Sequence, residues 1–367
     1  MMEEFRTAYR NRNQILQQKS AQGKKIAGWI CTYIPEEILY AAGMLPIRVV
    51  GSGGDTSTAD AYLYSNICSF ARGCLEEGMS GRYDFLEAYV AVNTCDNIRR
   101  LYDVWSAYGK TPFKHILALP HKVTDASAAL FQAEVECFKD RLEQHTGQKI
   151  TDENIREAIS LYNRTRELLC RLYELRKSEN PPISGTEVLE IVLASMQMDK
   201  VEYNQKLEQL LKDLSGRKKD ASDKIRLLLV GSELDSAEYL QAIEDQGGIV
   251  VADDLCNGTR YFSDPVEMNG DPLKALARRY LSKAPCARMQ PADERNQRVK
   301  KMVQDYNVRG IIYETIMFCD IYGENYPLLR EELKDQDVPI LSLSREAAFS
   351  GAGQLKTRVQ AFFESIG

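Results

Sequence analysis

Short apolar runs that alternate with helical segments are the feature that most constrains how this chain can fold. In the first third of the chain, strand-like runs occur at Ile26–Ile30, Ile47–Val50, Tyr89–Asn93 and His115–Leu119. In the last third they return at Ile225–Val230, Gly248–Ala252, Gly310–Tyr313 and Pro339–Leu343. Apolar strands joined by helices are typical of parallel sheets covered on both faces. The pattern therefore predicts an α/β protein with two parallel-sheet lobes of the Rossmann or flavodoxin-like kind.

The middle of the chain is helical in period and separates the two alternating parts. It includes one long expected helix over Thr186–Leu214, and an amphipathic helix is expected over the first 22 residues or so. We therefore expect an N-terminal α/β lobe with a leading helix over residues 1–123, a helical segment over 124–222, and a C-terminal α/β lobe over 223–367. A chain of 367 residues is long enough for several hydrophobic cores.

Charge and hydropathy argue against nucleic-acid and membrane partners. The chain has 47 basic and 53 acidic residues, a net charge of −6, and its short basic run Arg217–Lys218–Lys219 is typical of a solvated helix end. The N-terminus is polar, unlike a signal peptide, and no apolar run approaches the roughly 18 residues that suggest a membrane span. We expect a soluble, cytoplasmic protein.

Four of the nine cysteines lie just beyond strand-like runs, and these are Cys31, Cys95, Cys256 and Cys319. Ligands of α/β sheets bind at the carboxyl ends of the strands. The chain has no CxxC pair, so zinc ribbons and thioredoxin-like motifs are excluded, and any metal ligands must converge from distant segments. Thiolates gathered at strand ends indicate a metal or iron–sulfur centre, although buried structural cysteines remain the alternative.

Two further cysteines are placed for ligation. Cys68 opens a helix and Cys286 follows Pro285 in a loop. With Cys256 they form a second candidate set beside Cys31, Cys95 and Cys319. The other three cysteines lie inside helical patterns and are expected to pack in the interior: Cys74, Cys137 and Cys170.

The chain lacks the motifs of common nucleotide sites. The run Gly51–Ser52–Gly53–Gly54 follows a strand but does not have GxGxxG spacing, and no GxxxxGK[ST] loop is present. We therefore expect this chain to bind no nucleotide.

Several stretches together resemble the 2-hydroxyacyl-CoA dehydratase and benzoyl-CoA reductase family. They are GWICTYIPEE at 28–37, CSFAR at 68–72, GRYDFL at 81–86, CDNIRR at 95–100, DDLCNGTRYF at 253–262, FCD at 318–320 and SGAGQLKTRVQAF at 350–362. The resemblance covers the chain from about residue 25 to its end and is weakest across the helical segment.

The resemblance implies an iron–sulfur protein with a four-iron four-sulfur (4Fe-4S) cluster between two lobes, held by Cys31, Cys95 and Cys319. It implies a single low-potential electron from a separate ATP-hydrolysing iron–sulfur activator, a homodimer or a heterodimer of related subunits, and a small-molecule or acyl-CoA substrate. Related proteins carry a double cubane, an 8Fe-9S cluster with three cysteines on each cubane, and Cys68, Cys256 and Cys286 suit that arrangement.

Three functions therefore remain open. The first is a low-potential reductase component with a double cubane that reduces small molecules. The second is a 4Fe-4S subunit of a 2-hydroxyacyl-CoA dehydratase or benzoyl-CoA reductase. The third is an electron carrier or scaffold without a substrate.

Tyr33, Glu36 and Glu37 lie close to Cys31 in sequence and are candidates for proton transfer. Glu36 and Glu37 also follow Pro35, and acids in a first turn stabilise a helix start, which is the simpler interpretation of them.

Overall fold

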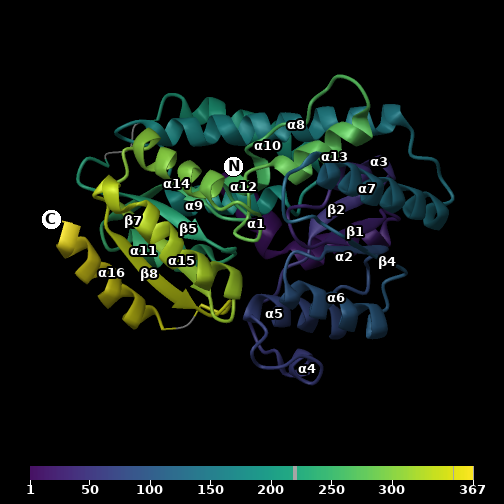
Figure 1. Cartoon of the computed structure of the whole chain (residues 1–367), viewed down its shortest axis with the longest axis horizontal. Coiled ribbons are helices and arrows are strands. Elements are labelled where there is room, and N and C mark those ends of the chain that lie inside the picture. The colour runs from purple at the N-terminus through teal and green to yellow at the C-terminus, as the bar shows by residue number, and fades with distance from the viewer. Residues whose placement is uncertain (218–220, 350, 367) are drawn as a thin grey trace.

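Two four-stranded parallel sheets, each flanked by helices, form the framework of the molecule (Figure 1). The computed structural model describes residues 1–217, 221–349 and 351–366. Lys218, Lys219 and Ser350, which belong to two of the sequence features above, lie outside the described residues. The two sheets confirm the predicted α/β class with two lobes.

The N-terminal sheet has the strand order β2-β1-β3-β4. Its strands are β1 (Ile26–Trp29), β2 (Leu45–Arg48), β3 (Ala88–Val92) and β4 (Phe113–Leu117). The helices of this part are α1 (Met2–Arg10), α2 (Arg12–Ala21), α3 (Glu36–Ala41), α4 (Ser57–Asp60), α5 (Ser69–Met79) and α6 (Asp96–Tyr108). The first three strands are buried along their whole length, as expected for a parallel sheet covered on both faces.

The C-terminal sheet has the equivalent order β6-β5-β7-β8. Its strands are β5 (Ile225–Gly231), β6 (Gly248–Asp254), β7 (Gly310–Ile316) and β8 (Ile340–Arg345). Its helices are α11 (Ala237–Glu244), α12 (Thr259–Phe262), α13 (Pro272–Ser282), α14 (Asp293–Asp305), α15 (Asp320–Glu332) and α16 (Ala352–Ile366), with the 3₁₀ turn η2 (Lys334–Gln336). All eight predicted strands are present, with ends that differ by a few residues.

The helices between the sheets are α7 (Asp125–Thr146), α8 (Asp152–Glu174), α9 (Gly185–Ser195) and α10 (Lys200–Leu214), with the 3₁₀ turn η1 (Leu175–Lys177). The prediction of one helix over Thr186–Leu214 is wrong, because the chain turns between α9 and α10. Asp199 caps the new helix by accepting a hydrogen bond from the backbone N–H of Val201 (2.9 Å).

Two other helix features differ from expectation. The leading helix is broken at Asn11 into α1 and α2. Helix α15 begins at Asp320 and has Pro327 inside it. Proline is a boundary signal in sequence, but this helix continues through it.

Contacts between distant segments bind the lobes to one another. Helix α9 packs against α1 and α11, whereas α13 packs against α7 and α8. Figure 1 shows α8 lying along one side of the molecule, over both lobes. On the outer side, the Arg6 guanidinium of α1 pairs with Glu190 of α9 at 2.8 Å. The lobes are thus held in a fixed relation, and residues at their facing strand ends can share one site.

Candidate functional site

The strand order of each sheet creates a crevice at its carboxyl end. In the N-terminal sheet, β2 lies on one side of β1 and β3 lies on the other, so the connections leave β1 and β3 in opposite directions and a crevice opens between these two strands. In the C-terminal sheet, the equivalent crevice opens between β5 and β7. Cys31 lies two residues beyond β1, and Cys95 is the N-cap of α6 beyond β3. Cys319 is the N-cap of α15 beyond β7. Three predicted ligands therefore lie at the two crevices.

Hydrogen bonds between the lobes surround the cysteines. The side-chain amide of Asn97 donates to the carbonyl of Phe318, next to Cys319 (3.1 Å). The backbone N–H of Ala347 donates to Ser69 Oγ, next to Cys68 (2.7 Å). The backbone N–H of Cys286 donates to the Tyr33 hydroxyl (3.0 Å). These three bonds bring segments of both lobes together at the predicted ligands.

Several of the predicted ligands have a pKa that neighbouring cysteines help to raise. Burial, together with the neighbouring thiols of Cys68, Cys31 and Cys286, raises the pKa of Cys95 to about 12. Burial also raises the pKa of Cys319, again with Cys68, Cys95 and Cys286 as neighbours. For Cys256, burial raises the pKa to about 11, and Cys31 contributes to this rise. The structure thus gathers all six predicted cysteines in one region.

Donors approach several of these sulfurs. The Thr94 hydroxyl donates to Cys31 Sγ (3.5 Å), and the backbone N–H of Ile98 donates to Cys95 Sγ (3.4 Å). The guanidinium of Arg48 donates to Cys256 Sγ (3.7 Å). Such donors favour the thiolate, which is the form that binds a metal.

The backbone is strained beside two of the ligands. Cys31 has φ +82° and Phe318, next to Cys319, has φ +65°. Residues with a Cβ atom rarely adopt this left-handed conformation, and it persists where the surrounding structure enforces it. The strained positions lie at the carboxyl ends of β1 and β7, where each lobe faces the other.

The three remaining cysteines lie inside helices. Cys74 is buried in α5, as predicted, and its thiol donates to the carbonyl of Val49 (3.8 Å). Cys170 of α8 is partly buried. The prediction of interior packing is wrong for Cys137, which lies on the exposed face of α7.

Glu36 and Glu37 begin α3, as their sequence position suggested, but both are buried in an ion-pair network with the helical layer. Burial would raise the pKa of Glu37, but Arg166 outweighs it at 2.5 Å and holds the pKa below its usual value. Burial raises the pKa of Glu36, whose Oε2 lies 3.8 Å from Lys200 Nζ and has no hydrogen-bond partner. Of the three proton-transfer candidates, only Tyr33 bonds directly to a predicted ligand.

Two buried charged residues at the site were missed by sequence reasoning. Arg48, at the end of β2, contacts Cys256 as described above. Glu233, two residues beyond β5, is 4% exposed and neither of its carboxylate oxygens has a hydrogen-bond partner. Burial raises the pKa of Glu233 to about 8. Its distance from the end of β5 matches that of Cys31 from the end of β1, which is the sequence signal that could have identified it.

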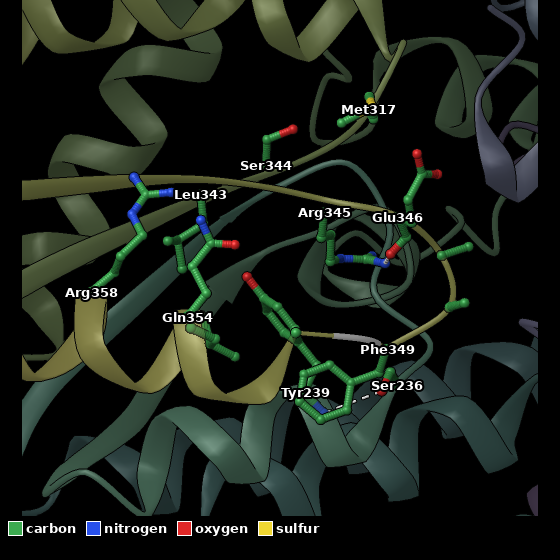
Figure 2. A pocket seen from close by; sticks show the side chains of 14 residues that line it. Ser236, Tyr239, Met317, Leu343, Ser344, Arg345, Glu346, Phe349, Gln354 and Arg358 are labelled. Carbon is green, nitrogen blue, oxygen red and sulfur yellow. Dashed lines mark hydrogen bonds between the residues drawn. The ribbon is translucent and has the colours of Figure 1, made fainter.

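A pocket of about 230 Å³ opens beside this region, at the ends of β8 and α16 (Figure 2). Arg345 lines it and pairs with Glu314 at 2.7 Å and with Glu233 at 3.7 Å. Figure 2 shows Tyr239 rising from α11 into the same space. The pocket therefore adjoins the buried charged residues Arg345, Glu314 and Glu233.

The donor set consists of thiols, which are the ligand type that holds iron–sulfur clusters. Within residues 1–217, 221–349 and 351–366, no three His, Cys, Asp or Glu side chains lie close enough to hold a single ion. A cubane carries its thiolates on different irons and therefore holds them farther apart. The six thiols come from strand ends, a helix start and a loop, and those of Cys31, Cys95 and Cys256 face donors.

None of the described helices has both the length and the apolar character that a bilayer crossing needs.

Comparison with known proteins gives the family. A profile described as "2-hydroxyglutaryl-CoA dehydratase, D-component" matches residues 31–366. The chain is 28% identical to the beta subunit of (R)-2-hydroxyglutaryl-CoA dehydratase of Acidaminococcus fermentans, over 100% of this chain and 99% of that protein. It is 27% identical to one of the subunits of benzoyl-CoA reductase of Thauera aromatica, over 94% and 91%. It is 25% identical to the (R)-phenyllactyl-CoA dehydratase beta subunit of Clostridium sporogenes, over 96% and 94%. With nearly the whole chain matched, the protein belongs to the family of 2-hydroxyacyl-CoA dehydratase and benzoyl-CoA reductase subunits.

Proposed function

We propose that this chain is the iron–sulfur component of a low-potential reductase that depends on an ATP-hydrolysing iron–sulfur activator. The observation that carries the proposal is the gathering of six thiols from both lobes, four of them just beyond strands of the two parallel sheets. A 4Fe-4S subunit of a dehydratase or benzoyl-CoA reductase would use three of them, whereas a double cubane would use all six. The sixfold set favours the double cubane and small-molecule reduction.

The residues fit a bound cluster in three ways. Cys68 is buried and the other five cysteines are partly buried, donors from Thr94, Ile98 and Arg48 face three of the sulfurs, and strained backbone holds Cys31 in position. When bound, an iron–sulfur cluster would supply one electron at a time at low potential, and iron without a thiolate would act as a Lewis acid. Arg48 would offset part of the negative charge that several thiolates bring together.

The electrostatic neighbours suggest how the six thiols divide between two cubanes. Among the thiols, Cys68 raises the pKa of Cys95 and of Cys319 the most. The pKa of Cys31 is raised by Cys286, and that of Cys256 is raised by Cys31. We therefore favour one set of Cys68, Cys95 and Cys319 and a second set of Cys31, Cys256 and Cys286. The sequence had suggested a different division, with Cys31 in the first set and Cys68 in the second.

Tyr33 is the strongest of the three proton-transfer candidates. Its hydroxyl accepts the N–H of Cys286, and Lys283 Nζ lies 4.3 Å from the centre of its ring. Glu36 and Glu37 would act only through the helical layer in which they are buried. Tyr33→Phe should keep the iron content and slow turnover, while Tyr40→Phe, in the following helix, should change neither.

The decisive experiment is anaerobic purification followed by iron and sulfide analysis and EPR of the reduced protein. About eight irons per chain would support the double cubane, and about four would support a single cluster. A colourless protein after attempted reconstitution would contradict the proposal. Turnover is then measured with activator and ATP. Reduction of small unsaturated molecules would indicate a reductase, and dehydration of acyl-CoA thioesters would indicate a dehydratase. An iron-containing protein without turnover would be an electron carrier or scaffold.

A further inference from the structure

The two lobes match residue by residue at their crevices. In the first lobe, Trp29 of β1 pairs with Val90 of β3; Cys31 lies two residues after the first and Cys95 five residues after the second. In the second lobe, Gly231 of β5 pairs with Glu314 of β7. Glu233 lies two residues after Gly231, and Cys319 lies five residues after Glu314. The second lobe therefore places Glu233 where the first lobe places Cys31.

The carboxylate of Glu233 has capacity to bind that its surroundings do not use. Both of its oxygens are buried without a hydrogen-bond partner. Its nearest cation is Arg345, at 3.7 Å, but the guanidinium of Arg345 already donates to Glu314 and to the backbone carbonyl of Glu233. Burying a carboxylate without donors costs several kcal/mol, so such a group is normally paired or bound to a metal.

Glu233 also lies next to a residue that contacts one of the cysteines. The backbone N–H of Cys256 donates to the carbonyl of Ser232, the residue before Glu233 (2.8 Å). The guanidinium of Arg48 also contacts Cys256, donating to its Sγ. Glu233 therefore lies on the segment that runs beside Cys256.

We propose that Glu233 is a seventh ligand of the proposed iron–sulfur centre, whose carboxylate binds iron at a position that no cysteine serves. The inference rests on the proposed iron–sulfur function. In a single cubane held by three thiolates, one iron is left without a protein ligand. In a double cubane, the shared sulfide already fills that position on both irons that it joins, so the carboxylate would bind there only in place of the sulfide. A carboxylate is a harder donor than a thiolate and binds cluster iron less firmly, so a substrate can displace it.

The test compares two buried acids of the same charge cluster in the full-length, anaerobically purified chain. Glu233→Gln removes the orphaned carboxylate, whereas Glu314→Gln removes a carboxylate that is already paired with Arg345. Iron content, Mössbauer spectra and EPR of the reduced protein are measured for both. We expect Glu233→Gln to change the spectrum of one class of iron and to make roughly one iron per chain removable by a chelator. Glu314→Gln should keep the wild-type spectrum.

A second variant guards against misfolding of the first. Glu233→Cys places a thiol where the mirrored position has Cys31, and should keep the full iron content with a spectrum shifted toward all-sulfur ligation. Spectra of Glu233→Gln and Glu233→Cys identical to those of an iron-containing wild type would overturn the inference and leave the proposed function intact. A wild type that binds no iron would overturn both.

Discussion

The crevices of the two lobes have the same topology and different chemistry. In the N-terminal lobe, Cys31 and Cys95 lie beyond β1 and β3, with neutral donors from Thr94 and Ile98 on their sulfurs. In the C-terminal lobe, the equivalent positions hold Glu233 and Cys319, beside the buried pair of Arg345 and Glu314. The fold therefore supplies the positions, and the side chains decide whether a position offers sulfur or charge. Four predictions break or sharpen this comparison.

The largest effect is expected at the matched cysteines. Cys95→Ser and Cys319→Ser occupy equivalent positions in the two lobes, so each should lose most of the iron of the cluster that it ligates, measured per chain after anaerobic purification. Cys137→Ser on the exposed face of α7 is the control and should keep the wild-type content. Full iron content in Cys95→Ser would remove this residue from the ligand set.

The next effect concerns the buried ion pair of the helical layer. Arg166→Met leaves Glu37 buried without its cation, which should lower the free energy of unfolding by about 3–5 kcal/mol. Arg164 lies on the same helix, but its pairs with Glu167 and Glu208 are exposed, so Arg164→Met should cost about 0–1 kcal/mol. Denaturant unfolding measures the loss of unfolding free energy in both variants. Equal losses would show that burial does not determine how much an ion pair contributes to stability.

The two lobes also differ in the space around one glycine of a central strand, Gly28 in β1 and Gly231 in β5. A Cβ atom at Gly231 would lie 2.2 Å from the backbone carbonyl oxygen of Glu314, whereas a Cβ at Gly28 would meet only side-chain carbons of Leu86 and Val49 at 2.7–2.8 Å. Because side chains can shift and the backbone of a central strand cannot, Gly231→Ala should destabilise the chain by about 3 kcal/mol and Gly28→Ala by about 1 kcal/mol. Thermal unfolding should show the larger loss for Gly231→Ala; the reverse order would mean that the C-terminal sheet adjusts more easily.

The smallest effect is a pH dependence carried by the N-terminal sheet. Burial, with help from Arg141, lowers the pKa of His115 on β4 from 6.5 to about 4. The folded state thus disfavours the proton, so this contribution to stability is complete above pH 6.5 and is lost as the pH falls toward 4. Between pH 7 and 5.5 the loss should be about 1 kcal/mol. In His115→Phe, the free energy of unfolding measured with denaturant should change less between pH 7 and 5.5 than in the wild type. An unchanged slope would mean that other groups cause the pH dependence.

Much of the fold could be predicted because its signals are local. Fully apolar runs such as Tyr89–Asn93 can only be buried strands or short buried helices, and the helical periods between them select parallel sheets. Two helix features were missed, because a capping aspartate and a proline are each compatible with more than one local structure. The break between α9 and α10 follows from the cap at Asp199, and α15 continues through Pro327.

The candidate site was only partly accessible in the same way. The position of Cys31, Cys95, Cys256 and Cys319 beyond strands identified them as candidates, because strand ends meet at one edge of a parallel sheet. Glu36 and Glu37 looked like solvated helix-start acids, and only the packing of α8 against α3 shows that they are buried ion-pair members. The helical period of Phe131, Val135, Phe138 and Leu142 leaves Cys137 off the apolar face of α7, a local signal that the assignment of helix cysteines to the interior overlooked.

The sequence by itself determined the α/β class, the two lobes and the identity of six candidate sulfur ligands, since these depend on local periodicity and on residue type. Tertiary structure alone decided which thiols are neighbours, that Arg48 contacts Cys256, and that Glu233 mirrors Cys31. Those relations join residues up to hundreds of positions apart, and they exist only because parallel strands align their ends and hydrogen bonds such as that from Asn97 to Phe318 hold the lobes face to face.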